Sequence, residues 1–320
     1  MNIINQKEIH IIARHSDVSE QEIGQALREN VYNGAKEWQR FFRLLILSFS
    51  VGFTVLGIAF FFAFNWASLH KFAKLGLAAS FLVASTGLSL HPRFNGQVRN
   101  ILLTGASVLV GVLFAVYGQI YQTGADTYEL FLTWFASISL WVLTSRFAPL
   151  WLLYLGLATT AFVLYAQVAL TSIFELNILF SITMAIGGLA IFRAKGEMPK
   201  WFIYTIILFS VGYLTTGVIN IIWMNRFPTE NLSVFTLMLA FIVYAAGMLI
   251  GIRKKSPFLL AVFPFGLTII VTNVMFFLLL ELNTSGSIEP FIFVGLFVVV
   301  CTSLIIKNLV RIKKNLTNGK

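Results

Sequence analysis

Long apolar runs, separated by short polar or basic segments, fill the chain from residue 44 almost to its C-terminus. A helix needs about 20 mostly apolar residues to cross the hydrocarbon core of a bilayer, and the runs recur at about that length. Ten spans are predicted, at residues 44–66, 72–90, 101–120, 130–144, 150–170, 173–192, 201–223, 234–252, 258–282 and 291–306. The pattern predicts an all-α fold, a polytopic integral membrane helical bundle of about ten transmembrane helices.

The boundary at Thr171 and Ser172 is the least distinct, because residues 150–192 also fit one very long apolar helix. Positive charge separates the two interpretations, since cytoplasmic loops carry an excess of Lys and Arg. Ten spans with a cytoplasmic N-terminus place 17 basic loop residues inside and 3 outside, whereas the merged helix places 7 inside and 13 outside. The charges therefore favour ten spans with both termini in the cytoplasm.

These boundaries divide the chain into four predicted regions. They are a cytoplasmic amphipathic helical segment (1–43), a first transmembrane half (44–170), a second transmembrane half (171–306) and a basic cytoplasmic tail (307–320).

The N-terminal segment begins a helix with a recognisable signal. Ser19 followed by Glu22 is a capping-box pattern, in which the two residues satisfy each other's backbone N–H groups. The residues that follow place an apolar face on this helix, formed by Ile23, Ala26, Leu27 and Val31. Two interpretations stay open: residues 1–35 dock a cytoplasmic or membrane protein partner, or the helix lies against the inner leaflet or the protein's own loops.

Composition excludes a soluble globule. Of the 320 residues, 58% are hydrophobic and 11% charged, whereas a soluble domain carries about a quarter charged residues. The formal net charge of +10 does not indicate a nucleic-acid partner, because the basic residues are scattered over short loops instead of forming one patch. Membrane lipids are the predicted surroundings. The first apolar run follows about forty mostly polar residues and has no cleavage-site pattern, so we expect the first span to be retained.

Signatures of catalysis are missing from the sequence. No ionisable residue lies near the middle of any predicted span, which disfavours a proton-driven antiporter. The four histidines show no metal-ligand spacing, and no nucleotide-binding loop or hydrolase motif is present. We therefore expect no enzymatic activity, no cofactor and no metal site. The neutral polar residues inside the spans, Gln167, Asn220 and Asn273, fit either a substrate path or hydrogen bonds between helices.

The densest polar stretch, "GQIYQTGADTY" at 118–128, follows the third span and is predicted to lie at the outer membrane face. The segment "FNWASLHKFAK" joins the first two spans on the same side and holds two of the three basic residues predicted outside. We hypothesise a shallow pocket in which a lysine meets an anionic group, either a lipid headgroup or a small solute. Its candidate ligand-binding residues are Asn65, Trp66, Lys71, Lys74, Gln119, Tyr121, Gln122 and Asp126.

An ordinary interfacial turn explains the same stretch equally well. In that interpretation Gly118 and Gly124 end the helix, and the tyrosines belong to the aromatic belt at the membrane surface. The fourth span is short, about fifteen residues, so the polar stretch is also predicted to dip into the headgroup region.

The segments "GIAFFFAFNWASLHKFAKLGLAAS" and "GQIYQTGADTYELFLTWFA" resemble a bacterial membrane protein family known as domain of unknown function 2157. The resemblance covers roughly residues 10–180. It implies a protein of the bacterial cytoplasmic (inner) membrane with a short helical N-terminal segment, and it brings no established activity.

Two functions are carried forward. The first is a transporter or permease of a small solute or lipid, since ten spans suffice to enclose a path. The alternative is a non-catalytic membrane scaffold or sensor, whose outer site binds a ligand or partner and whose N-terminal helices report to the cytoplasm. A third hypothesis, an enzyme at the outer face with Asp126 as general base, rests on one isolated acid.

Overall fold

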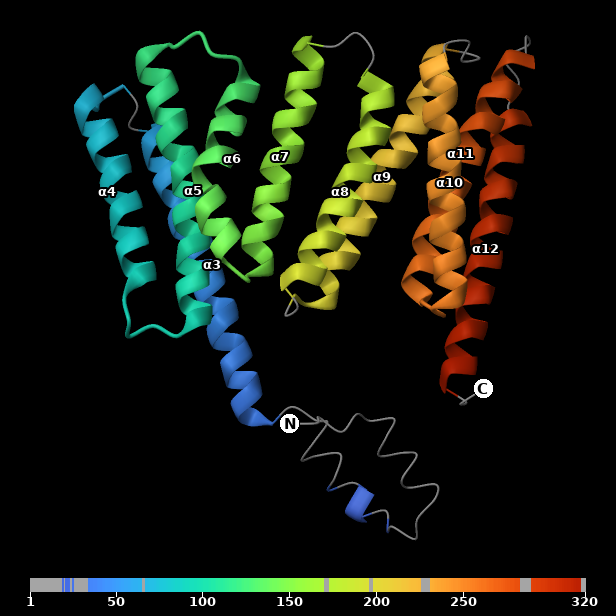
Figure 1. The fold of residues 1–320 in the computed structure, drawn as a ribbon, viewed down its shortest axis with the longest axis horizontal. Coiled ribbons are helices and arrows are strands. Elements are labelled where there is room, and N and C mark those ends of the chain that lie inside the picture. Colours follow the sequence, from blue (N-terminus) through green and yellow to red (C-terminus); the bar gives the residue numbers. More distant parts are fainter. Residues whose placement is uncertain are drawn as a thin grey trace. The chain divides into compact units, whose positions relative to one another are not determined.

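A computed structural model describes residues 19, 21–23, 25, 34–64, 67–169, 173–195, 198–225, 231–282 and 289–317. All regular secondary structure assigned in these residues is helical, which confirms the all-α class. The long helices are α3 (Ala35–Phe64), α4 (Lys71–Leu90), α5 (Gly96–Tyr121), α6 (Thr127–Thr144), α7 (Ala148–Ala169), α8 (Ile173–Lys195), α9 (Lys200–Asn225), α10 (Asn231–Arg253), α11 (Pro257–Leu282) and α12 (Glu289–Thr317) (Figure 1).

Each long helix coincides with one predicted span. Within the described residues, eight helices are long and apolar enough to cross a membrane by length and composition. Helices α6 and α8 are not among them. The protein is therefore a polytopic helical membrane protein. The count of ten spans and the cytoplasmic position of both termini stay predictions.

The helices on either side of residues 170–172 are separate. Helix α7 ends at Ala169 and α8 begins at Ile173, and the two pack against each other. One very long helix is thereby excluded, as the charge pattern predicts. Thr171 and Ser172 themselves lie outside the described residues.

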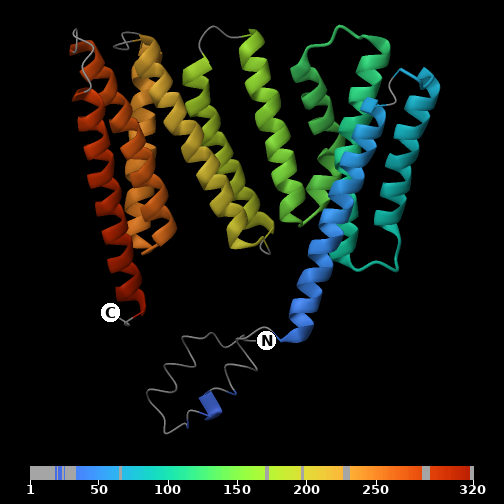
Figure 2. The ribbon, with the colours of Figure 1, turned by 180° about the vertical axis from the view of Figure 1, so that it is seen from behind.

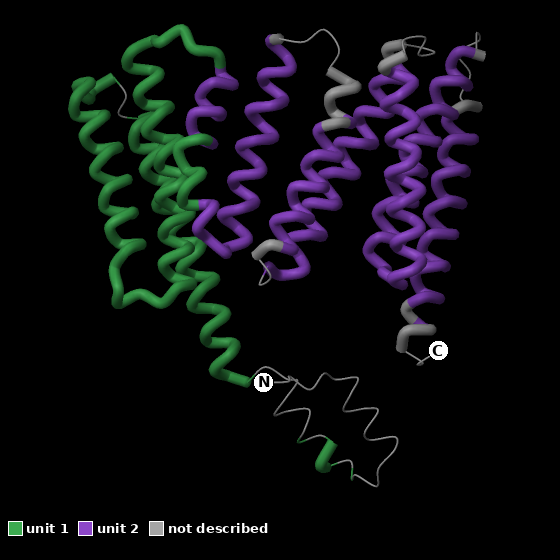
Figure 3. Tube along the Cα trace, viewed as in Figure 1, with its two compact units in different colours: residues 1–126, 136–141 green, residues 127–135, 142–320 purple. Residues whose placement is uncertain are grey.

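The chain divides into two compact units, which are described separately here (Figure 3). Unit 1 holds residues 1–126 and 136–141, and unit 2 holds residues 127–135 and 142–320.

In unit 1, helix α5 packs against both α3 and α4 and carries most of the buried side chains. Figures 1 and 2 show the three helices running in alternating directions. Gly105 is where α5 approaches α3, because a Cβ atom there would lie 2.5 Å from Cγ1 of Val51. A larger residue at this position would separate the two helices.

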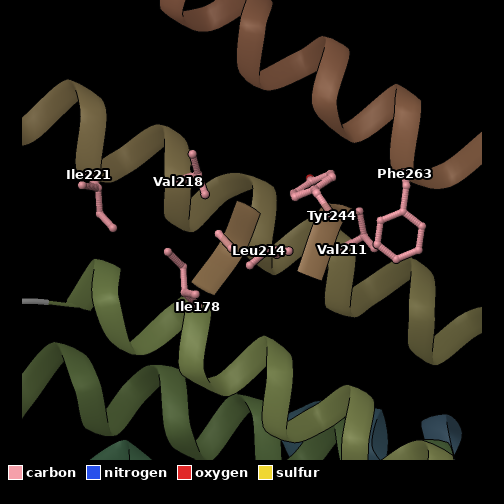
Figure 4. Close-up of a cluster of buried hydrophobic side chains, with 8 residues drawn as sticks. Ile178, Val211, Leu214, Val218, Ile221, Tyr244 and Phe263 are labelled. Atoms are coloured by element: carbon pink, nitrogen blue, oxygen red, sulfur yellow. The ribbon is translucent and has the colours of Figure 1, made fainter. Parts of the chain in front are cut away.

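The core of unit 2 is a group of buried apolar side chains contributed by α8, α9, α10 and α11 (Figure 4). One polar contact crosses it: the hydroxyls of Tyr244 and Thr215 lie 2.6 Å apart. Thr215 also donates to the carbonyl oxygen of Val211 at 2.6 Å, so the Tyr244 hydroxyl is the donor in the first bond. The core residues are Ile178, Val211, Leu214, Val218, Ile221, Ala240, Tyr244 and Phe263.

Glycines allow the helices of unit 2 to pack closely. A Cβ on Gly247 would meet the ring of Phe263, and one on Gly251 would lie 3.2 Å from Leu259 and Leu260. This pair, spaced as in G-x-x-x-G, thus marks the contact of α10 with α11. Helix α11 continues through Pro264 without interruption.

Candidate functional site

The end of α3, the start of α4 and the end of α5 meet at one end of unit 1 (Figures 1 and 2). This end, defined by Phe62, Ala78 and Val116, is called the Lys74 end below. These three side chains are almost fully buried, one from each helix. The partly buried residues packed against them are Ile58, Leu69, Leu75, Leu77, Val112, Leu113 and Ile120.

Lys74 is built into this end. It lies four residues before Ala78 and therefore on the same face of α4, and its residue surface is only 9% exposed. An ammonium group can be buried only if it is hydrogen-bonded or near opposite charge. The long stem can lie along the apolar core while the charged head reaches polar surroundings. Lys74 thus places a cation at the point where three helix ends meet.

Lys71 has a different environment from Lys74. It is exposed, and its Nζ atom lies 5.3 Å from the ring centroid of Phe72, which is itself exposed. Such an exposed cation–π contact contributes about 0.5–1 kcal/mol. Lys71 is therefore a surface residue, and only one of the two candidate lysines belongs to the core of the Lys74 end.

Helix α5 ends through backbone conformation at Gln122. This residue is left-handed, with φ 44° and ψ 52°, and its N–H donates to the carbonyl oxygen of Gly118 at 2.9 Å. Gly124 follows with φ 65°. Gly118 lies inside α5, so its predicted role as a helix breaker is wrong, whereas Gly124 does lie in the turn. Lys255 after α10 has a similar positive φ of 47°, so this geometry alone marks a helix end and not a binding site.

The remaining candidates on and after α5 are exposed: Gln119, Tyr121, Gln122 and Asp126. Tyr121 packs against Tyr117, with ring centroids 4.7 Å apart. Helical spacing places both rings well to one side of the face that holds Val116, so Tyr121 does not point toward Lys74. Asn65 and Trp66 lie outside the described residues.

The polar stretch is more helical than predicted. Helix α6 starts at Thr127 and has 18 residues, because Thr127 to Glu129 form its first turn. The helix is three residues longer than the predicted fifteen-residue span. Glu129 is favourable in this position, since the start of a helix carries partial positive charge.

Sequence comparison defines the extent of the resemblance. Residues 16–151 match the family of predicted membrane proteins DUF2157. The searches of curated proteins and of solved structures found no match. The DUF2157 match confirms the resemblance over a shorter range than predicted. It contains α3 to α6, including the whole Lys74 end, and reaches only the first residues of α7.

Within the described residues, no group of three or more His, Cys, Asp or Glu side chains could hold a metal ion. Sequence reasoning missed the buried hydroxyl pair of Thr215 and Tyr244. Its signal was weak, because Ser and Thr side chains inside apolar runs usually bond to their own helix. Several here do so, for example Thr268, which donates to the carbonyl oxygen of Pro264 at 2.9 Å.

Proposed function

We propose that the protein is a non-catalytic membrane sensor that binds an anionic group at the Lys74 end of unit 1. The burial of Lys74 among three helix ends is the observation that carries the proposal. Burial of an ammonium group is favourable only beside polar or anionic groups, and an anionic ligand at these helix ends is one such group. Gln119, next to the core face of α5, supplies a neutral hydrogen-bonding group at the same end.

Helix α3 provides a connection between the two ends of unit 1. It runs unbroken over 30 residues, a length of about 45 Å. Phe62 near its end belongs to the core at the Lys74 end. Near its start, Arg40 Nη2 donates to Gln97 Oε1 of α5 at 3.0 Å. A ligand that shifts the helix ends around Lys74 therefore acts on a helix whose other end leads to the N-terminal segment.

The predicted topology gives this connection a direction. Positive charge places the Lys74 end outside and residues 1–43 in the cytoplasm, with the bacterial cytoplasmic membrane as the location that the family resemblance implies. In this proposal a protein partner binds residues 1–35 and responds to the change in α3. Most of this segment lies outside the described residues.

The test compares Lys74→Met with wild type. Methionine keeps the length and apolar packing of the lysine stem, so the fold should survive. In purified protein, phosphatidylglycerol and inorganic phosphate are the two anionic probes, and phosphatidylcholine is the neutral one. We expect at least one anionic probe to raise the thermal unfolding temperature of wild type and of the control Lys254→Met by more than it raises that of Lys74→Met. Equal stabilisation of all three proteins would contradict the site.

The reporting step has its own test. A single cysteine introduced as Lys36→Cys, in a Cys301→Ser background, lies at the start of α3. The anionic probe should change the rate at which a water-soluble maleimide labels this cysteine, and Lys74→Met should diminish the change. Binding of the probe without any change in labelling would support an anion-binding site but contradict the sensor function.

A transporter for a small uncharged solute is the second candidate, and unit 2 provides its support. The hydroxyl oxygens of Ser210 and Thr272 are buried and have no hydrogen-bond partner among the described residues. Such groups usually bond to protein or water. They are neutral, in keeping with an uncharged solute.

Asn220 of α9 and Asn273 of α11 lie at the same level. Gly266 meets Val211, and the ring centroids of Phe277 and Trp223 lie 5.4 Å apart, so α9 and α11 run parallel in a fixed register. That register puts Asn273 level with Asn220, and both are half-buried. Flux of glycerol or urea into proteoliposomes that is lost in Asn273→Leu would establish transport. The sensor is preferred because apolar side chains fill the core shared by α8 to α11.

A further inference from the structure

The opposite end of unit 1, where α3 and α5 begin and α4 ends, is strongly basic. It is called the Arg99 end and is separate from the site proposed above. Within residues 35–100 it holds five basic residues and one acid, Glu37. The basic residues are Lys36, Arg40, Arg43, Arg93 and Arg99, and all are exposed.

Hydrogen bonds to neutral groups hold two of these arginines in place. Arg40 Nη2 donates to the Gln97 side-chain oxygen at 3.0 Å. Arg99 Nε donates to the backbone carbonyl oxygen of Ser89, also at 3.0 Å. Because neither acceptor is charged, both guanidinium groups are positioned without being neutralised. Each retains further N–H donors for a ligand.

The loop that carries Arg93 is closed by hydrogen bonds at both ends. The Arg93 N–H donates to His91 Nδ1 at 3.2 Å, and the His91 N–H donates to the carbonyl oxygen of Leu88 at 3.2 Å. Asn95 caps α5 by accepting from the Val98 N–H at 2.9 Å. The loop therefore presents Arg93 from a defined backbone beside the first turn of α5.

An aromatic cluster sets the membrane depth of this end. Trp38, Phe41 and Phe42 are about half exposed, and their ring centroids lie 5.6–5.8 Å apart. Helical spacing puts Trp38 and Phe42 on the side of α3 away from Val51 and Val55, which face α5, and puts Phe41 between the two sides. Exposed Trp and Phe side chains at the end of a span lie in the interfacial layer of the bilayer.

We propose that Arg40, Arg93 and Arg99 bind the phosphate groups of anionic phospholipids at this end, with Arg40 on the α3 side of α5 and Arg99 on its α4 side. Arg40 shares a helical turn with the aromatic cluster and is therefore at headgroup depth. Guanidinium groups suit phosphate oxygens because they offer paired N–H donors. Charge complementarity and the interfacial depth select a lipid of the adjacent leaflet as the occupant, in preference to a soluble anion. Acyl chains would then lie along the exposed apolar side chains of α3.

The experiment titrates the purified full-length protein with phosphatidylglycerol and with phosphatidylcholine of the same acyl chains, and follows bound lipid by native mass spectrometry. Wild type should bind phosphatidylglycerol more tightly. Arg93→Gln removes a charge without breaking either helix-to-helix hydrogen bond and should weaken that binding about fivefold. Arg40→Gln with Arg93→Gln and Arg99→Gln should weaken it by at least about tenfold.

The matched control removes three charges elsewhere, as Arg253→Gln with Lys254→Gln and Lys255→Gln, and should bind as wild type does. Wild-type affinity in the triple variant of unit 1, or an equal loss in the control, would overturn the site. Displacement of the lipid by millimolar inorganic phosphate would overturn the lipid as its occupant. Lys74→Met should leave this binding intact, so the result is independent of the sensor proposal. Unfolding temperatures measured without lipid identify any variant whose fold is damaged.

Discussion

The two units bury polar groups in different ways. In unit 1 the buried polar group at the Lys74 end is a lysine, and the apolar core beside it is small. In unit 2 the polar group within the core is the neutral hydroxyl of Tyr244, bonded to Thr215 and surrounded by side chains from four helices. Neutral hydroxyl pairs are inexpensive inside a membrane protein, whereas charge is retained for function. The comparison assigns packing to the core of unit 2 and agrees with the ligand sites proposed at the ends of unit 1.

The first prediction tests the close packing of unit 2. Gly266→Leu should destabilise the protein by about 1–3 kcal/mol or more. A Cβ at this position would lie 2.6 Å from the Tyr244 hydroxyl oxygen and 3.1 Å from Val211 Cγ1, and the rest of the leucine has no space. Thermal unfolding in detergent measures the effect. Gly212→Leu is the matched control, because a Cβ there meets nothing within 4 Å. Equal stability of the two variants would show that unit 2 is loosely packed.

The second prediction makes the same change in unit 1. Gly105→Leu should lower stability by about 1–2 kcal/mol, since a Cβ there would crowd Val51. The cost should be smaller than in unit 2, because the crowded atoms belong to side chains of the single helix α3. Gly118→Leu, which faces open space on the same helix α5, serves as control. A larger loss in unit 1 than in unit 2 would reverse the comparison.

Apolar runs and charge predict the helices well, because both depend on the bilayer and not on the partners of a helix. Each of the ten long helices lies where an apolar run is, and the separation of α7 from α8 follows from the positive charges alone. Turn residues predict less. The sequence suggests Gly118 as a helix breaker, but the backbone turns at Gln122, since a left-handed residue need not be glycine.

The candidate site shows the limit of sequence reasoning more clearly. Lys71 and Lys74 look equivalent in sequence, yet one is exposed and the other is buried beside three helices. That difference comes from tertiary packing, namely the position of Phe62 and Val116 opposite the same face of α4. The hydrogen-bond acceptors of Arg40 and Arg99 could not be predicted from the sequence either, because each hydrogen bond joins segments separated along the chain.

The third prediction removes one hydroxyl from the core of unit 2. Tyr244→Phe should cost about 1 kcal/mol of stability, because Thr215 loses its donor but keeps its own bond to Val211. A double-mutant cycle with Thr215→Val measures the coupling between the two hydroxyls. Tyr117→Phe, an exposed tyrosine of unit 1, should have a smaller effect. No coupling in the cycle would mean that the polar contact contributes nothing to unit 2.

The smallest predicted effect concerns the exposed carboxylate of Glu22, in the capping box of unit 1. The Glu22 carboxylate accepts hydrogen bonds from the Ser19 N–H at 3.0 Å and the Ser19 hydroxyl at 2.9 Å, as the capping-box pattern predicts. These bonds lower the pKa of Glu22 below its ordinary value of 4.5, with the backbone bond as the larger cause. The folded form thus favours the carboxylate. The capping contribution is fully present above about pH 4.5 and is lost as the pH falls through the lowered pKa.

Amide hydrogen exchange of Glu22 and Ile23 in the full-length protein measures this loss. The Glu22 N–H donates to Ser19 Oγ and the Ile23 N–H to the Ser19 carbonyl oxygen, so both report on the helix start. After correction for the intrinsic exchange rate, protection should be lower at pH 3 than at pH 6. In Glu22→Gln, which has no charge to titrate, it should stay constant between these pH values. The same fall in protection in wild type and Glu22→Gln would show that the carboxylate does not stabilise the capping box. The contributions of Lys74 and of the arginines at the Arg99 end would then each need a separate measurement, because the pH response of Glu22 reports only on the capping box.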